Sequence, residues 1–363
     1  MRILLLSDVN SAHTRRWAEG LSKRGMEVGI FSISSPKDQW HLEQAGIQML
    51  HDCENAKSGK TLIEKLGYLK LLRKLKQAIN KFQPEIVHAH YATSYGLLGV
   101  LSGFQPLVIS TWGTDVFSFP KKTKLHARLL TYIFSKANVI CSTSYCMKEE
   151  IAKYMKREVK VIPFGVDEEL FYPEYFSPDK TSICIGNIKA LETGYGNNLL
   201  LIAFGELVKK YKHKNLKLLL VGDGPQRAEL VKIVEDLKLS NFVELAGKIP
   251  HAQVAAYHRK IDIFVSPTLV EESFGVSLVE SMASGKAVVA SDTPGFMEVL
   301  ASAENGTIVK RNSVSALTDA ISKYIESPVL MINHGKSARI HVSKHYVWKN
   351  NLDAMIEVYK NIK

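Results

Sequence analysis

Cysteines and long apolar runs are scarce in this chain. Four cysteines stand in 363 residues, too few and too scattered for a disulfide framework. No apolar run approaches the roughly 18 residues that a membrane helix needs. The opening residues 1–8 read as a buried strand entering a loop, and not as a signal peptide. We therefore expect a globular cytoplasmic protein, with a peripheral position at the inner face of the membrane as an open alternative.

Metal-binding patterns are also missing. The sequence has no Asp-x-Asp motif that would hold a metal against a diphosphate. His88 and His90 lie on one face of a predicted strand, and two histidines alone make a poor metal site. We expect this pair to be packed or hydrogen bonded, and we expect neither a metal nor another cofactor.

Positive charge is in excess, with 47 Lys and Arg against 36 Asp and Glu, a net charge of +11. Such a surface attracts nucleic acid, acidic lipid or phosphorylated substrates. Residues 57–82 carry eight Lys or Arg against one Glu, with Leu and Ile at helical spacing. This segment is either an ordinary surface helix or an interfacial helix drawn to anionic lipid. Aromatic side chains do not interleave with the basic ones, so we expect no nucleic-acid partner.

Short apolar runs alternate with helix-length segments along nearly the whole chain. This alternation predicts parallel sheets covered by helices on both faces. The predicted strands are Ile3–Ser7, Glu27–Ser32, Ile86–His90, Leu107–Thr111, Val139–Ser142 and Lys160–Pro163, then Ser182–Gly186, Lys217–Gly222, Phe242–Leu245, Ile263–Ser266, Ala287–Ser291 and Thr307–Val309. The fold class is therefore α/β, with two Rossmann-like doubly wound domains facing a cleft.

The alternation breaks at residues 163–180, a segment with three prolines and no periodicity that reads as a linker. We expect an N-terminal domain over 1–165 and a C-terminal domain over 166–345. A last helix over 346–363 is expected to pack back toward the N-terminal domain. Ligands of open α/β sheets bind at the carboxyl ends of the strands, so candidate sites are sought there.

The segment EESFGVSLVE, residues 271–280, places two glutamates on either side of a helix start. Glu272 falls before the predicted helix and Glu280 about two turns into it, a rise of about 12 Å. That is roughly the distance from the sugar of a nucleotide sugar to its ribose, and free N–H groups at Gly275 and Val276 would suit the phosphates between them. The plainer interpretation is that acidic residues favour first turns and that a mid-helix glutamate is solvated.

Wider sequence context favours the first interpretation. The stretch EESFGVSLVESMASGKAVVASDTPGFMEVL resembles the E-x7-E signature of retaining nucleotide-sugar-dependent glycosyltransferases of family 4, which have the GT-B fold. LSDVNSAHTRRWAEGLSKRGMEVGIFS, VISTWGTDV, LLLVGDGPQRAEL and VELAGKIPHAQVAAYHRKIDIFVSPTL resemble other parts of that family in the same order. The resemblance covers nearly the whole chain.

The resemblance implies a hexosyl transfer from a nucleotide-diphosphate sugar, expected to be a UDP-sugar, to an acceptor hydroxyl with retention. Glu272 would lie by the donor sugar as a catalytic residue and Glu280 would hold the ribose. The expected acceptor is a saccharide or lipid-linked saccharide of bacterial surface polysaccharide or glycolipid assembly. The other expected donor-binding residues are Gly275, Val276, Phe274, Lys189, Asn187, Gly222, Lys248 and Ile249.

Two regions depart from the family pattern. Relatives carry an Arg and a Lys after the first strand of the second domain, where Asn187 and the Gly194–Tyr195 region stand here. A departing diphosphate needs positive charge or oriented N–H groups. Lys189 is the nearest cation that could replace the missing Arg and Lys. Trp112 stands where relatives often have His, which favours a backbone contact over a side-chain role.

The acceptor is expected to meet the loop after the first strand. His13 is the candidate catalytic residue there, and Asn10, Ser11, Arg15, Arg16 and Trp112 are the candidate acceptor-binding residues. Two other classes of function stay open. A nucleotide-sugar epimerase of related architecture would need no acceptor, and a non-catalytic sugar-nucleotide-binding protein would bind the donor without turnover.

Overall fold

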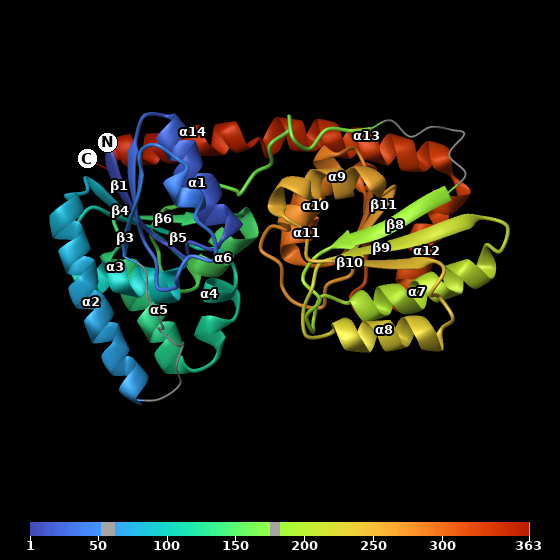
Figure 1. The fold of residues 1–363 in the computed structure, drawn as a ribbon, viewed down its shortest axis with the longest axis horizontal. Helices are drawn as coiled ribbons and strands as arrows, with labels where there is room; N and C mark the ends of the chain where they lie inside the picture. The colour runs from blue at the N-terminus through green and yellow to red at the C-terminus, as the bar shows by residue number, and fades with distance from the viewer. Residues whose placement is uncertain (52–61, 175–181, 363) are drawn as a thin grey trace. The chain divides into compact units, whose positions relative to one another are not determined.

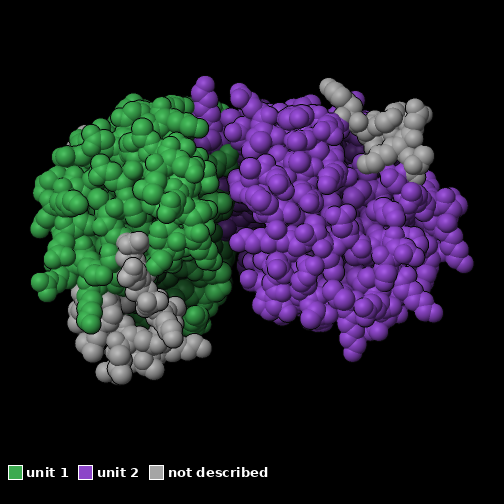
Figure 2. Space-filling view, in the orientation of Figure 1, with its two compact units in different colours: residues 1–163, 350–363 green, residues 164–349 purple. Residues whose placement is uncertain are grey.

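The computed structural model describes residues 1–51, 62–174 and 182–362, with the backbone alone for 62–69 (Figure 1). The chain divides into two compact units. One unit comprises residues 1–163 and 350–363, and the other comprises residues 164–349 (Figure 2). The chain therefore leaves the first unit after Pro163 and returns to it at Asn350.

The first unit is built on a parallel sheet of seven strands in the order β3-β2-β1-β4-β5-β6-β7. Its strands are β1 (Arg2–Leu6), β2 (Glu27–Phe31), β3 (Ile47–His51), β4 (Ile86–His90), β5 (Leu107–Ser110), β6 (Val139–Ser142) and β7 (Val159–Val161). Its α-helices are α1 (Ala12–Lys23), α2 (Leu62–Phe82), α3 (Leu97–Ser102), α4 (Thr114–Phe117), α5 (Lys124–Lys136), α6 (Tyr145–Ala152) and most of α14 (Trp348–Asn361). The strand order reverses between β1 and β4, which makes that point the topological switch point.

The second unit is built on a parallel sheet of six strands in the order β10-β9-β8-β11-β12-β13. Its strands are β8 (Ser182–Ile188), β9 (Asn215–Val221), β10 (Val243–Gly247), β11 (Ile263–Ser266), β12 (Ala287–Ser291) and β13 (Thr307–Val309). Its α-helices are α7 (Asn197–Lys210), α8 (Arg227–Asp236), α9 (Val254–Lys260), α10 (Val276–Ala283), α11 (Pro294–Leu300), α12 (Val314–Glu326) and α13 (Pro328–His345). Here the order reverses between β8 and β11.

Both sheets confirm the predicted doubly wound α/β class. Central strands such as β4 and β12 are buried at every position, as strands of parallel sheets covered on both faces are. The edge strand β3 was not among the predicted strands. Within the described residues it pairs with β2 alone. Its sequence IQMLH is buried at Ile47 and partly exposed beyond it, so it lacks the apolar run that marks the central strands.

Helix α14 belongs to the first unit from Asn350 onward. Tyr359 is fully buried, and its hydroxyl lies 2.6 Å from Nδ1 of His88 on β4. Nε2 of the same histidine lies 2.8 Å from Oγ of Ser110 on β5. The final helix is thus tied to the centre of the first sheet. Among the helices that the structure describes, none combines the length and apolar character needed to cross a membrane.

Candidate active site

The predicted donor-binding residues gather at one edge of the second sheet. Lys189 follows β8, Gly222 follows β9, Lys248 follows β10 and Glu272 lies in the loop after β11. These four strands are neighbours in a parallel sheet, so their carboxyl ends lie along the same edge. Lys189 and Glu272 flank the switch point between β8 and β11, where open α/β sheets bind their ligands.

An ion pair joins the two loops at the switch point. Nζ of Lys189 lies 2.7 Å from Oε1 of Glu272, and the two side chains are 25% and 13% exposed. The ammonium group also lies 4.5 Å from the centroid of the Tyr195 ring. One cation is therefore held at this edge of the sheet by a carboxylate and an aromatic ring, and it remains partly accessible to solvent.

Glycines let the neighbouring loop pack closely against Lys189. Gly222 has φ +140°, and a Cβ there would come within 2.0 Å of the Lys189 carbonyl oxygen. A Cβ at Gly224 would come within 2.4 Å of the carbonyl oxygen of Leu191. Side chains at either position would displace the backbone that carries Lys189, which gives GDGP at 222–225 a structural role in the site.

Helix α10 begins at the same edge. Gly275 is its N-cap residue with φ +83°, and a Cβ there would lie 2.4 Å from Cε1 of Phe296. The first N–H groups of an α-helix have no acceptor inside the helix, so Val276 opens an end suited to an anion. Phe274 is 1% exposed, and its ring packs against Phe164 and Tyr346 with centroid distances of 6.2 and 5.3 Å. Phe274 can therefore offer a ligand its backbone but not its ring.

Glu280 lies on α10 and is 7% exposed. Its Oε2 lies 3.3 Å from Nε2 of His258, a fully buried residue of α9. The structure thus excludes a solvated Glu280. A buried carboxylate needs a hydrogen-bond partner, and the His258 imidazole supplies one here.

Three predicted donor residues stand apart from the ion pair. Asn187 is 2% exposed and donates from Nδ2 to Oδ1 of Asn197 at 3.0 Å, so it contributes an amide dipole and no charge. Lys248 is exposed and Ile249 half-buried beyond the end of β10. That strand is at the edge of the sheet, two places from β8.

The sequence reasoning missed Arg311 and His258. Arg311 contacts Oε1 of Glu271 at 3.0 Å and Oδ1 of Asp292 at 3.3 Å. Its contact with Glu271, the residue next to Glu272, is partly exposed, and such an ion pair holds the loop only weakly. No local spacing links Arg311 to Glu271, because the contact is made between residues forty positions apart.

At the corresponding edge of the first sheet, His13 lies in ring contact with Trp112. The rings of His13 and Trp112 lie 5.6 Å apart, and those of Trp112 and His90 lie 4.8 Å apart. His13 lies in the first turn of α1 after β1, His90 ends β4, and Trp112 follows β5. Burial lowers the pKa of His90 well below its ordinary value, with the charges of His88 and His13 acting in the same direction. A neutral imidazole therefore lies beneath Trp112 at the switch point of this sheet.

The remaining acceptor candidates have local partners. Ser11 is the N-cap of α1 and accepts a hydrogen bond from the His13 N–H, while Asn10 donates from Nδ2 to the Ser35 carbonyl at 2.9 Å. Arg15 pairs with Glu19 at 2.7 Å and lies 5.5 Å from the Trp40 ring centroid. Arg16 is half-buried on the same helix.

Asp115 of the WGTD segment has a structural role. Its fully buried carboxylate accepts hydrogen bonds from the N–H groups of Ala92, Trp112 and Gly113 at 2.8, 3.2 and 2.8 Å. Burial raises its pKa despite these bonds. Within the described residues, no group of three or more His, Cys, Asp or Glu side chains could hold a metal ion.

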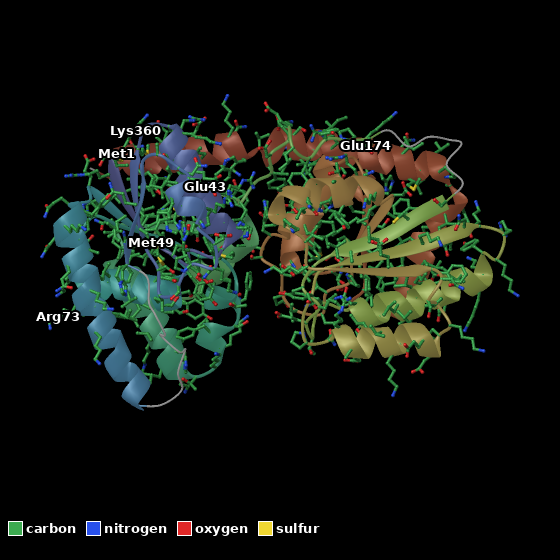
Figure 3. All side chains as sticks on the ribbon, in the orientation of Figure 1. Met1, Glu43, Met49, Arg73, Glu174 and Lys360 are labelled. Carbon is green, nitrogen blue, oxygen red and sulfur yellow. The ribbon has the colours of Figure 1, made fainter. Side chains whose placement is uncertain are left out.

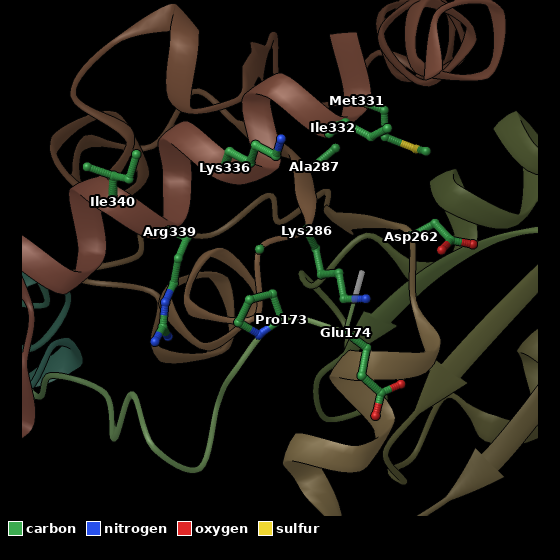
Figure 4. A pocket seen from close by; sticks show the side chains of 11 residues that line it. Pro173, Glu174, Asp262, Lys286, Ala287, Met331, Ile332, Lys336, Arg339 and Ile340 are labelled. Carbon is green, nitrogen blue, oxygen red and sulfur yellow. The ribbon is translucent and has the colours of Figure 1, made fainter. Parts of the chain in front are cut away.

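A cavity of about 300 Å³ lies elsewhere in the second unit (Figure 4). Its lining includes Asp262, directly before β11, and Lys286 and Ala287, directly before and at the start of β12. Lys336 and Arg339 of α13 also line it. These residues mark the amino ends of the strands, whereas Lys189 and Glu272 follow the carboxyl ends. No predicted site residue lines this cavity, so we do not assign the donor to it.

Two family models match this chain. Residues 2–144 match the model described as "Glycosyl transferase 4-like", and residues 172–341 match the one described as "Glycosyl transferases group 1". Together these matches take in most of both units. They agree with the resemblance drawn from the E-x7-E segment.

Among curated proteins, one relative is a lipopolysaccharide core biosynthesis mannosyltransferase of Rhizobium leguminosarum bv. viciae. It is 26% identical over 254 residues, which are 65% of this chain and 68% of the relative. Another is one of the subunits of human phosphatidylinositol N-acetylglucosaminyltransferase, 30% identical over 288 residues, 76% of this chain and 57% of the relative. The chain thus spans little more than half of that human protein.

Two solved structures match this chain over nearly its whole length. A sucrose-phosphate synthase from Thermosynechococcus elongatus matches with a TM-score of 0.81 at 22% identity, covering 99% of this chain and 98% of that one. The Anabaena protein HepE, solved in complex with UDP and glucose, also matches with a TM-score of 0.81, at 19% identity over 99% of this chain and 100% of that one. At these identities the likeness establishes the fold.

Proposed function

Because this chain belongs to the group 1, GT4-like glycosyltransferases and has their GT-B fold, we propose that it moves a sugar from a nucleotide-diphosphate sugar to an acceptor hydroxyl with retention. The observation that carries the proposal is the ion pair of Lys189 and Glu272 at the switch point, with α10 and Glu280 beside it. Both family models are described as glycosyl transferases, which favours a transferase over an epimerase or a non-catalytic binding protein.

The donor would lie along the carboxyl edge of the second sheet. Glu280 would accept hydrogen bonds from the ribose hydroxyls, and Glu272 would accept them from the donor sugar. The N–H groups of Gly275 and Val276 would meet the diphosphate, which the dipole of α10 favours. A UDP-sugar is the proposed donor, in line with the UDP complexes of HepE.

Lys189 would supply the positive charge that stabilises the leaving diphosphate. Its Nζ already lies 2.7 Å from Glu272, so it needs only to share its contact between carboxylate and phosphate. Electrostatic stabilisation of this kind is often the largest single contribution to catalysis. The leaving phosphate would take the proton of the acceptor hydroxyl, and Glu272 would hold the sugar without forming a covalent bond to it.

The acceptor would meet the carboxyl edge of the first sheet. His13 and Trp112 lie in ring contact there, above the neutral His90. Of the two arginines, Arg15 is exposed and engaged with Glu19, so a side-chain contact with an acceptor would require it to leave that ion pair. We propose a saccharide or lipid-linked saccharide acceptor in bacterial surface polysaccharide or glycolipid assembly. The mannosyltransferase of lipopolysaccharide core biosynthesis supports this class by similarity.

An anionic membrane surface is the proposed site of action. The basic segment 57–82 lies partly outside the described residues, and α2 is its described part. Leu71, Leu75, Ala78 and Phe82 of α2 are buried in the core of the first unit. Arg73 projects from the outer side of the helix (Figure 3). The apolar side of this part of α2 is therefore used by the core, and its attraction to lipid would be electrostatic.

A donor panel tests the proposal. Purified enzyme is mixed with UDP-, GDP- and ADP-sugars, and release of nucleoside diphosphate is measured with and without a bacterial membrane extract. We expect release from one nucleotide class, stimulated by the extract. Equal inactivity toward every donor in the presence of extract would contradict the proposed reaction.

A further inference from the structure

His258 is the histidine of α9 and is fully buried in the second unit. Its Nε2 lies 3.3 Å from Oε2 of Glu280 on α10. Within the described part of the chain, this imidazole is the hydrogen-bond partner of the Glu280 carboxylate. The contact joins two helices that the sequence separates by β11 and its loop.

The other side of the imidazole is apolar. Its ring lies 5.6 Å from the ring of Phe171 and 5.7 Å from that of Phe264. Nδ1 is buried and has no hydrogen-bond partner in the described residues. An apolar side chain of similar size would pack here at less cost than an imidazole with one unpaired nitrogen. The contact with Glu280 is the polar interaction that distinguishes histidine at this position.

One tautomer of His258 explains the arrangement. A proton on Nε2 provides a donor for Oε2 of Glu280, and it leaves on Nδ1 a lone pair instead of an N–H group without acceptor. This donor fixes the rotation of the carboxylate about its last bond. It engages Oε2, and Oε1 is left without a contact to the imidazole.

We propose that His258 is a positioning residue that orients Glu280 for the ribose hydroxyls of the donor nucleotide. The inference rests on the proposed function, because it takes Glu280 as the ribose-binding carboxylate. A ribose 2′,3′-diol is a pair of donors, and its recognition depends on a carboxylate held in one orientation. Removal of the imidazole donor leaves a buried carboxylate that can turn, and this weakens the selection of ribose over deoxyribose.

Binding of a ribonucleotide and its deoxy counterpart tests the inference. Calorimetry measures the Kd of the intact enzyme for UDP and for 2′-deoxy-UDP, and the pair based on GDP or ADP replaces them if the donor panel selects that base. We expect the deoxy nucleotide to bind the unaltered enzyme roughly tenfold more weakly, because it lacks a hydrogen bond to a charged group. In His258→Phe, which keeps a ring and removes the donor, the two Kd values should lie within about twofold of each other.

Two further variants separate positioning from packing. His258→Gln restores an N–H donor and should recover most of the discrimination, whereas His213→Phe, an exposed histidine after α7, should leave it unchanged. Thermal unfolding shows whether each variant is folded at the assay temperature. If His258→Phe proves unfolded, His258→Gln is compared with His258→Asn instead. Asn keeps the amide donor on a side chain one methylene shorter, which places the donor farther from Glu280. Discrimination retained in Asn as fully as in Gln would then overturn the inference.

The failure of the inference differs from that of the proposed function. If the unaltered enzyme binds UDP and 2′-deoxy-UDP equally, Glu280 does not hold the ribose and the donor assignment is wrong. If the unaltered enzyme discriminates and a folded His258→Phe discriminates equally well, the donor assignment stands. His258 is then a packing residue and the inference is overturned.

Discussion

Nζ of Lys189 and Oε1 of Glu272 lie 2.7 Å apart, although the two residues are 83 positions apart in the chain. Each follows a strand that flanks the reversal of strand order in the second sheet. The pair brings a cation and a carboxylate to the point where this fold class binds nucleotides. In the proposed reaction the cation serves the leaving diphosphate and the carboxylate serves the donor sugar.

Replacement of Lys189 tests the source of positive charge. Lys189→Met keeps the aliphatic stem and removes the ammonium, so we expect kcat/KM to fall roughly 100-fold. Lys189→Arg should retain a large part of the activity. Steady-state release of nucleoside diphosphate measures both, and Lys232→Met, at an exposed lysine of α8, is the matched control. Equal activity of Lys189→Met and the control would show that another group neutralises the diphosphate.

Gly275 is predicted to tolerate no side chain. Alanine there adds the strain of φ +83° to a Cβ only 2.4 Å from the Phe296 ring. We expect Gly275→Ala to lower the free energy of unfolding by roughly 2 kcal/mol or more and to weaken donor binding. Gly25→Ala is the control, because Gly25 has φ +78° with nothing within 4 Å of its Cβ. Its expected cost is about 1 kcal/mol with donor affinity unchanged. Equal effects of the two substitutions would show that the contact with Phe296 does not add to the cost of a side chain at Gly275.

Stability of the first unit should fall on mild acidification. Burial lowers the pKa of His88 from 6.5 to about 3. The unfolded chain therefore binds more protons than the folded one between these pH values, and stability decreases as the pH falls below 6.5. At pH 5 the His88 contribution alone is a loss of about 2 kcal/mol relative to pH 7. Hydrogen exchange of β4 amides at the two pH values measures it, and His88→Gln should reduce the dependence. If the pH dependence of stability were unaltered in His88→Gln, groups other than His88 would be its cause.

The basic face of α2 is predicted to bind anionic lipid. Reversal of three exposed charges, Lys70→Glu, Arg73→Glu and Lys74→Glu together, should weaken binding to phosphatidylglycerol vesicles at low salt by at least roughly tenfold. The same reversal at Lys209, Lys212 and Lys232, exposed lysines of the second unit, controls for net charge. Vesicle sedimentation measures both. If both triple variants lost vesicle binding equally, the binding would depend on overall charge, and α2 would not be the lipid-binding surface.

Much of the fold was predictable, since central parallel strands are apolar at successive positions and their helices repeat at 3.6 residues. The edge strand β3 escaped because one partner and partial exposure leave it without that pattern. The spacing of Glu272 and Glu280 was visible because both residues lie in one short segment, the loop before α10 and the first turns of that helix. The roles of His258 and Arg311 could not be predicted from the sequence. Their contacts with Glu280 and Glu271 depend on how separate helices and loops pack. Phe274 was expected at the donor, and only its buried ring shows that its side chain belongs to the core.

The division of labour between Glu272 and Glu280 is tested most directly by one set of glutamine variants. Initial rates of nucleoside diphosphate release and the Kd of the free nucleotide are measured for Glu272→Gln, Glu280→Gln and, as the neighbouring control, Glu271→Gln. We predict that Glu272→Gln lowers kcat roughly 100-fold with nucleotide Kd little changed, because its partner is the sugar. Glu280→Gln should raise the nucleotide Kd roughly tenfold, and Glu271→Gln should change neither. Turnover and nucleotide binding that are unaltered in both Glu272→Gln and Glu280→Gln would contradict the assignment of this site.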